Sequence, residues 1–245
     1  MTNRNNLFLL TLLLTVACDT SEYKRCDSFV EAYDYMEGVL LRYNELGAGE
    51  IAIYPYLGHN GSLSCSFFST GQRQNKYAEL CASHNDNGYP HDVLVMNKYD
   101  IDGTRYSMTD FDSLAIYSSK AFDSAHAAGT SLADVVRFIS FSPVKFIKSG
   151  YVSTYDYSTE NPLSCKFKKI VSLKGISGEQ PYHPIDKLLT DIQAEELSLL
   201  GFKTHSPLGY LLFEKYSTLT DFQEFTIQVF CSDGRLLSGT IQIEF

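Results

Sequence analysis

Two sets of side chains in this sequence have the types and spacing that chemistry requires. Ser142 and Lys145 have the Ser-x-x-Lys spacing of penicillin-interacting enzymes, in which the lysine lies one helical turn from the serine nucleophile. Cys81, His84 and His91 offer a thiolate and two imidazoles, which are ligands that zinc prefers. The first set would attack an acyl group, and the second would hold a metal.

Both sets lack the context that their chemistry needs. The run KFIKSGYV after Pro143 alternates like a strand, and Lys203 and Thr204 are followed by His205 where a Lys-Thr-Gly motif needs glycine. No second close pair of ligands completes a tetrahedral zinc site. The acidic side chains near the middle of the chain do not have the spacing of an EF-hand calcium loop: Asp100, Asp102, Asp110 and Asp112. We therefore predict no catalytic residue, no metal ligand and no cofactor.

Tyrosines suggest a different kind of site, a recognition surface. If residues 145–157 form a strand, Tyr151, Tyr155 and Tyr157 lie on one side of it while Val152 points into the core. Tyrosine suits a binding face because it offers a stiff apolar ring with a polar tip. We take these three tyrosines as candidate ligand-binding residues. The alternative is that their rings pack across strands and stabilise the sheet.

The N-terminus has the layout of a secretory signal peptide. The eleven residues from Leu7 to Ala17 carry no charge, follow Arg4, and end in a small residue before Cys18. A run of this length is too short to span a bilayer. Residues 14–18 resemble the lipobox of bacterial lipoproteins, although Thr15 stands where leucine is usual. We expect Cys18 to be the lipidated N-terminus; the alternative is cleavage just after Cys18 and release of a soluble protein.

The formal net charge of −9 at pH 7 excludes one class of partner. Affinity for nucleic acid needs clustered Lys and Arg, and only residues 166–169 form a basic cluster, in a context that alternates like a strand. The segment after Cys18 mixes both signs, so it predicts no polybasic membrane contact. The expected partners are the membrane, through the lipid, and a glycan or an envelope protein.

Short strands are the elements that would carry such a surface. Residues 225–231 and 237–243 alternate around Asp233 and Gly234, which predicts a closing β-hairpin. Strand-like runs recur upstream between turn residues, at 50–57, 64–69, 76–82, 92–101, 112–119 and 145–157. Residues 129–138 and 186–202 favour short helices. The pattern predicts a mainly β chain, an antiparallel sandwich with one or two short helices.

Several segments, among them LAIYSSKAFDSAHAAGTSLADVVRF and the terminal hairpin, resemble a family of Bacteroidales lipoproteins that is defined only as a domain of unknown function. The shared features are a lipobox, a segment similar to FDxxHxAGTSLxD that contains His126, and two C-terminal strands around an Asp-Gly turn. The resemblance implies an immunoglobulin-like sandwich whose first strand is residues 38–44. We expect His126 to cap or pack rather than to catalyse.

Together these features predict a signal peptide at 1–17, an N-terminal tether at 18–35 and a single β-sandwich domain at 36–245. The predicted protein is exported and anchored to the bacterial cell membrane, on the periplasmic or surface side of the outer membrane, with a non-catalytic binding or assembly role. An envelope hydrolase with an unrecognised active site is the alternative.

Overall fold

The computed structural model describes residues 22–43, 49–58, 63–95, 104–158, 163–173, 176–202, 206–214 and 222–244. The described residues are mainly β, with 43% strand and 17% helix. Cys18 and the predicted signal peptide lie outside the described residues.

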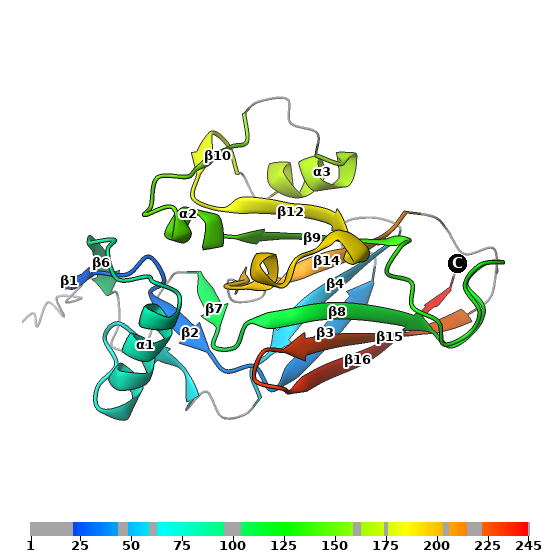
Figure 1. Cartoon of the computed structure of the whole chain (residues 1–245), viewed down its shortest axis with the longest axis horizontal. Coiled ribbons are helices and arrows are strands. Elements are labelled where there is room, and N and C mark those ends of the chain that lie inside the picture. Colours follow the sequence, from blue (N-terminus) through cyan, green and yellow to red (C-terminus); the bar gives the residue numbers. More distant parts are fainter. Residues whose placement is uncertain are drawn as a thin grey trace, which may run out of the picture.

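Two antiparallel sheets form the body of the molecule, here called the sandwich (Figure 1). The five-stranded sheet has the order β12-β9-β14-β4-β3. Its strands are β3 (Gly38–Tyr43), β4 (Glu50–Tyr56), β9 (Val136–Ser142), β12 (His183–Leu188) and β14 (Gly209–Phe213). The three-stranded sheet has the order β16-β15-β8, with β8 (Phe111–Ser118), β15 (Phe222–Cys231) and β16 (Leu236–Glu244).

A shared hydrophobic core joins the two sheets. Alternation decides which side chains enter it: on β4, Ile51 and Ile53 face the three-stranded sheet. Ala52 faces the other way and belongs to a cluster with Phe167 and Ile170 of α3 (Cys165–Leu173). On β15, four alternate apolar side chains are buried, namely Phe225, Ile227, Val229 and Cys231. The core therefore lies between the sheets, and α3 covers the outer face of the larger one.

The predicted C-terminal hairpin is confirmed. Strands β15 and β16 pair from Phe222 with Glu244 to Phe230 with Leu236. Gly234 has φ 83°, a left-handed conformation that glycine adopts without strain and that closes the tight turn. Strands expected at 38–44, 50–57 and 112–119 are also present, as β3, β4 and β8.

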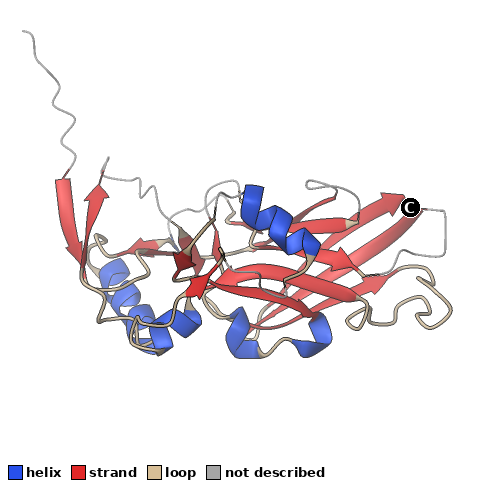
Figure 2. Ribbon diagram, turned by 90° about the horizontal axis from the view of Figure 1, so that it is seen from above, coloured by secondary structure: helices blue, strands red, loops and turns tan. Residues whose placement is uncertain are grey.

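A second group of elements, here called the N-terminal lobe, packs beside the sandwich. Its four-stranded sheet has the order β13-β7-β2-β5, in which β2 and β7 run parallel. These strands are β2 (Ala32–Asp34), β5 (Cys65–Ser66), β7 (Arg105–Ser107) and β13 (Gly201–Phe202). Helix α1 (Gln72–Ser83) covers this sheet, and β1 (Glu22–Cys26) pairs with β6 (His91–Val95) in a ribbon that projects from the body (Figure 2).

The predicted tether at 18–35 is wrong for its described part. Val30, Ala32 and Tyr33 are fully buried, and β2 is an inner strand of the lobe sheet. Apolar side chains at these positions stabilise the lobe only when the segment folds against it. Residues 22–35 are therefore part of the folded protein.

Most of the helices do not lie where the sequence predicted them. The described residues contain three α-helices: α1 where a strand was predicted at 76–82, α2 (Val144–Lys148) across the start of the run 145–157, and α3 over the basic cluster 166–169. The helix predicted at 129–138 is instead a turn followed by β9. The one predicted at 186–202 is the end of β12 followed by the 3₁₀ turns η2 (Leu189–Asp191) and η3 (Ala194–Leu197), then β13. A last pair, β10 (Tyr155–Asp156) with β11 (Glu179–Gln180), lies above β12 (Figure 1).

Candidate functional site

An aromatic pocket of about 220 Å³ lies where the N-terminal lobe meets the segment before β12. Four rings, a carboxylate, an imidazole and a hydroxyl line it. They come from four segments that are far apart in the sequence: Phe29 and Glu31, Tyr89 and His91, Thr104 and Tyr106, and Tyr182. Only folding brings them together.

The end of α1 sets the position of the first segment. Asn85 has φ 57° and turns the chain so that the Asp86 amide donates to the Cys81 carbonyl at 2.8 Å. The fully buried carboxylate of Asp86 then accepts the backbone amides of Phe29 at 2.7 Å and Val30 at 2.8 Å. Burial raises the pKa of Asp86 above its ordinary value, although these amides act in the opposite direction. The carboxylate thereby fixes the backbone next to Glu31.

A Glu–His pair forms the polar wall of the pocket. The Nε2 atom of His91 lies 3.1 Å from Oε1 of Glu31, and its Nδ1 atom lies 3.1 Å from the carbonyl oxygen of Tyr89. Both partners are oxygen atoms, so each ring nitrogen of His91 lies within hydrogen-bond distance of an acceptor. Both ring nitrogens of His91 therefore have a partner within the protein.

The aromatic wall is built from edge-to-face contacts. The ring of Phe29 lies 5.4 Å from that of Tyr89 and 5.8 Å from that of Tyr182, with interplanar angles of 73° and 61°. Tyr106, buried on β7, donates from its hydroxyl to the hydroxyl oxygen of Tyr182 at 3.4 Å. Such contacts stabilise each ring by about 1 kcal/mol beyond its buried area, so the wall is preformed.

The three tyrosines predicted to bind a ligand do not form one face. Tyr151 has φ 66° directly after α2, and the side chain of Val152 is 76% exposed rather than in the core, so the predicted strand is wrong. The hydroxyl of Tyr157 donates to the carbonyl of Tyr182 at 2.9 Å, and Tyr155 lies beside Tyr157, with ring centroids 4.7 Å apart.

Tyr151 and Tyr157 instead support the pocket from behind. The ring of Tyr151 packs 5.2 Å from that of Tyr89, and its hydroxyl donates to Oδ1 of Asp86 at 3.0 Å. Burial raises the pKa of both Tyr151 and Tyr157. The sequence thus singled out residues that hold the pocket rings in place, while the pocket's lining contains none of the three.

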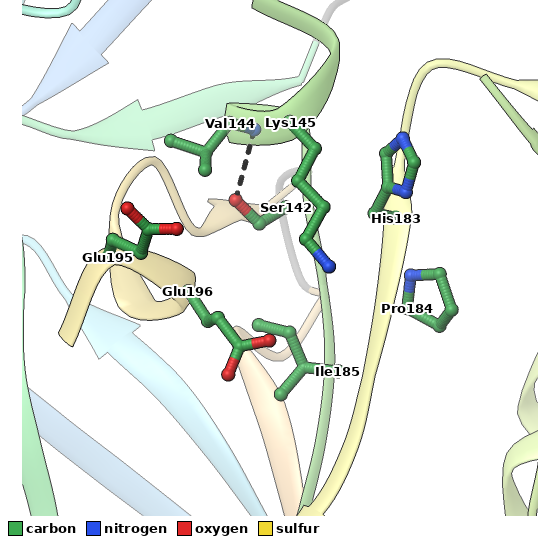
Figure 3. Close-up of a pocket in the computed structure, with 8 residues that line it drawn as sticks. All are labelled: Ser142, Val144, Lys145, His183, Pro184, Ile185, Glu195 and Glu196. Atoms are coloured by element: carbon green, nitrogen blue, oxygen red, sulfur yellow. Dashed lines mark hydrogen bonds between the residues drawn. The ribbon is translucent and has the colours of Figure 1, made fainter. Parts of the chain in front are cut away.

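Ser142 and Lys145 border a much smaller hollow (Figure 3). Its volume of about 10 Å³ is close to the least that holds one water. The hydroxyl of Ser142 donates to the carbonyl of Ser198 at 2.8 Å and accepts the amide of Val144 at 3.2 Å. Lys145 does lie on a helix, α2, contrary to the predicted strand, but no hydrogen bond among the described residues joins it to Ser142. The serine therefore serves the turn into α2.

The candidate zinc ligands are held apart by other partners. Cys81 lies in α1 with its thiol buried, His84 bonds to Asp110 at 3.0 Å, and His91 bonds to Glu31. In the part of the chain that the structure describes, no three His, Cys, Asp or Glu side chains are grouped to hold a metal ion. The five cysteines in this part are all unbridged: Cys26, Cys65, Cys81, Cys165 and Cys231.

His126 bridges two carboxylates of its own loop. Its Nδ1 lies 2.6 Å from Asp123, and its Nε2 lies 3.0 Å from Asp134. Asp123 also accepts the amides of Ala125 and His126, at 2.8 and 2.9 Å. His126 therefore holds its own loop together through both carboxylates, as expected for a capping histidine.

No protein-family model, curated protein or solved structure matches the chain. Across the described ranges, no helix combines the length and the apolar character needed to cross a bilayer. The site is therefore defined by its own geometry. Of its seven lining residues the sequence drew attention only to His91, and for a different chemistry, because no local pattern marks residues that four separate segments contribute.

Proposed function

We propose that this chain is a lipoprotein of the bacterial cell envelope, attached to the membrane through a lipid on Cys18, that binds a small ligand in the aromatic pocket without changing it chemically. The observation that carries the binding role is the pocket itself: concave, lined by aromatic rings and equipped with a few polar groups, which is the usual form of a ligand site. The lipobox-like residues 14–18 support the anchor.

Binding is favoured over hydrolysis by the contacts of His91. A general base needs a free nitrogen within reach of the group that it deprotonates. Both nitrogens of His91 are engaged, with Glu31 and with the Tyr89 carbonyl. Ser142, the other candidate nucleophile, uses its proton to bond the Ser198 carbonyl.

The immunoglobulin-like class belongs to this proposal in a restricted sense. Two antiparallel sheets around one core support a sandwich of the kind that many cell-surface domains share without sharing its exact topology. The order β12-β9-β14-β4-β3 differs from the ABED sheet of antibody domains. The Bacteroidales resemblance supports the same class and the outer-membrane address.

Filling the pocket tests the binding role. Thr104→Phe would place a ring in the space that the half-buried Thr104 borders, whereas Thr240→Phe places the same ring on the exposed side of β16. A ligand-observed NMR screen of neutral sugars, amines, carboxylates and aromatic alcohols should find a ligand for the wild type and for Thr240→Phe, but not for Thr104→Phe. A folded wild-type protein that binds none of these classes would refute the proposal.

Mass spectrometry of the protein purified from membranes tests the anchor. We expect the mature chain to begin at Cys18 with a diacylglyceryl thioether on its sulfur. An unmodified N-terminus at Asp19, or an uncut chain, would show that the lipid anchor is absent.

A further inference from the structure

The size of the pocket limits its occupant to about one ring. Its volume of about 220 Å³ is below the roughly 300–1,000 Å³ of pockets that hold drug-sized molecules. A single six-membered ring with substituents fits this space. A longer ligand would have to place only its terminal ring inside.

The lining presents hydrogen-bonding atoms that the protein does not use. Within the described residues, Oε2 of Glu31 and the hydroxyls of Tyr89 and Thr104 have no hydrogen-bond partner. The hydroxyl of Tyr182 accepts from Tyr106, so its own proton is also free to donate. Unused polar groups at a partly buried site gain free energy when a ligand pairs with them. The set contains one strong acceptor, one donor and two groups that do both.

A ligand that matches this set must itself both donate and accept at several positions around a ring. Hydroxyl groups on a saturated ring do so, and the C–H faces between them are apolar enough to lie on Phe29, Tyr89 or Tyr182. A plain aromatic ligand would leave the polar atoms unpaired, at a cost in affinity.

The charges at the pocket disfavour an anionic ligand. The carboxylate of Glu31 lies on its polar wall, 3.1 Å from the imidazole of His91. An anion would face this carboxylate inside a protein whose net charge is −9. An uncharged ligand avoids this repulsion and can still pair with Oε2 of Glu31.

We infer that the pocket takes a single uncharged pyranose ring, as the terminal residue of a glycan, with one ring face on the aromatic wall and its hydroxyls on Glu31, Tyr182 and Thr104. This inference rests on the proposed binding function and narrows it to one class of ligand.

Titration of the detergent-solubilised mature protein tests the inference. The probes are the methyl glycosides of glucose, galactose, mannose and N-acetylglucosamine, with tetramethylammonium chloride and benzyl alcohol as probes of an aromatic cage and of a plain apolar pocket. At least one glycoside should bind. Glu31→Gln and Tyr182→Phe, which keep the shape of the pocket, should each weaken that binding about tenfold, as expected for loss of one well-made hydrogen bond.

Matched controls separate the site from the rest of the surface. Glu79→Gln changes an exposed carboxylate on α1, and Tyr56→Phe removes a hydroxyl from the exposed Tyr56 on β4; both should bind as the wild type does. Binding of tetramethylammonium or benzyl alcohol without any glycoside would overturn the pyranose inference and leave the binding function standing. Glycoside binding that both pocket variants retain unchanged would overturn the assignment to this pocket. Failure of every probe would overturn the inference, and the wider NMR screen described above then decides whether the binding function stands.

Discussion

At the scale of single residues, Asp86 connects the helix end to the pocket. Its carboxylate accepts two backbone amides and the Tyr151 hydroxyl, so it determines where Phe29 lies and where Tyr89 is supported. None of these three groups belongs to the pocket's polar lining. Asp86 is therefore a positioning residue that does not line the pocket. Removing its carboxylate should lower the stability of the fold without removing a direct contact to a ligand.

Replacing Asp86 with alanine should lower the free energy of unfolding by about 3 kcal/mol, because two amides lose a charged acceptor in a buried place. Tyr151→Phe removes one of the same hydrogen bonds and should cost about 1 kcal/mol. Urea unfolding followed by circular dichroism measures both. A change of less than about 0.5 kcal/mol in Asp86→Ala would contradict the role assigned here.

The pair His84–Asp110 should make stability depend on pH. Burial of the His84 ring acts to lower its pKa, but the hydrogen bond and charge of Asp110, with the Leu80 carbonyl, outweigh burial, and the net pKa is raised. The pKa of Asp110 shifts in the opposite direction. Burial acts to raise it, but the hydrogen bond and charge of His84 outweigh burial, and the net pKa is lowered. The stability due to His84 is therefore full below its unfolded pKa of about 6.5 and is lost as pH rises through the higher folded value.

This prediction is checked by urea unfolding of the wild type and His84→Gln from about pH 6 to about pH 9. The difference in unfolding free energy between the two proteins should be largest near pH 6 and should shrink as pH rises. Asp110→Asn should abolish the same trend. A difference that stays constant over the range would show that His84 is not ionised in its pair.

At the scale of elements, the β15–β16 hairpin supplies one face of the sandwich core. Ile243 is 1% exposed and lies on the buried face of β16, whereas its neighbour Gln242 is exposed. Ile243→Ala should lower the free energy of unfolding by about 3 kcal/mol through lost burial and a cavity. Gln242→Ala should change it by less than about 0.5 kcal/mol. Equal effects of the two substitutions on the melting temperature would show that the register is wrong.

The hairpin also shows what the sequence could predict. Its strands alternate over seven residues each, and the Asp-Gly turn fixes the register, so local pattern and fold agree. In α1, by contrast, Tyr77, Leu80 and Cys81 follow the helical spacing of three and four, but the short run around them also alternates enough to favour a strand. Packing against the lobe sheet, rather than the local pattern, determines that this segment is a helix.

The candidate site was less predictable than the fold, because tertiary packing rather than a local sequence pattern brings its residues together. Tyr151 and Tyr157 stood out because they lie close together in the sequence. The structure separates them: Tyr151 packs on Tyr89, and Tyr157 packs on Phe167 across the five-stranded sheet from the main core. The residues that do converge are spread from Phe29 to Tyr182, and their convergence depends on tertiary contacts that no local period encodes.

At the scale of the whole molecule, residues 22–35 are part of the folded protein and not an extended tether. A chain that begins at Met36, the start of the domain predicted from sequence, would lack Val30 and Tyr33 and would leave β7 without its parallel neighbour. We expect it to be recovered insoluble, or to melt well below a control chain that begins at Glu22. Equal melting temperatures for the two chains would show that the lobe does not need these residues.

The projecting β1–β6 ribbon limits how far the pocket can lie from a membrane. If Cys18 carries the lipid, the four-residue step from it to Glu22 spans at most about 14 Å when fully extended. The four steps along β1 from Glu22 to Cys26 add about 13 Å, and Cys26 pairs with His91 at the pocket wall. Ligands would then be met within roughly 30 Å of the lipid surface. At that distance the proposed pocket would reach the end of a glycan that projects from the same membrane surface.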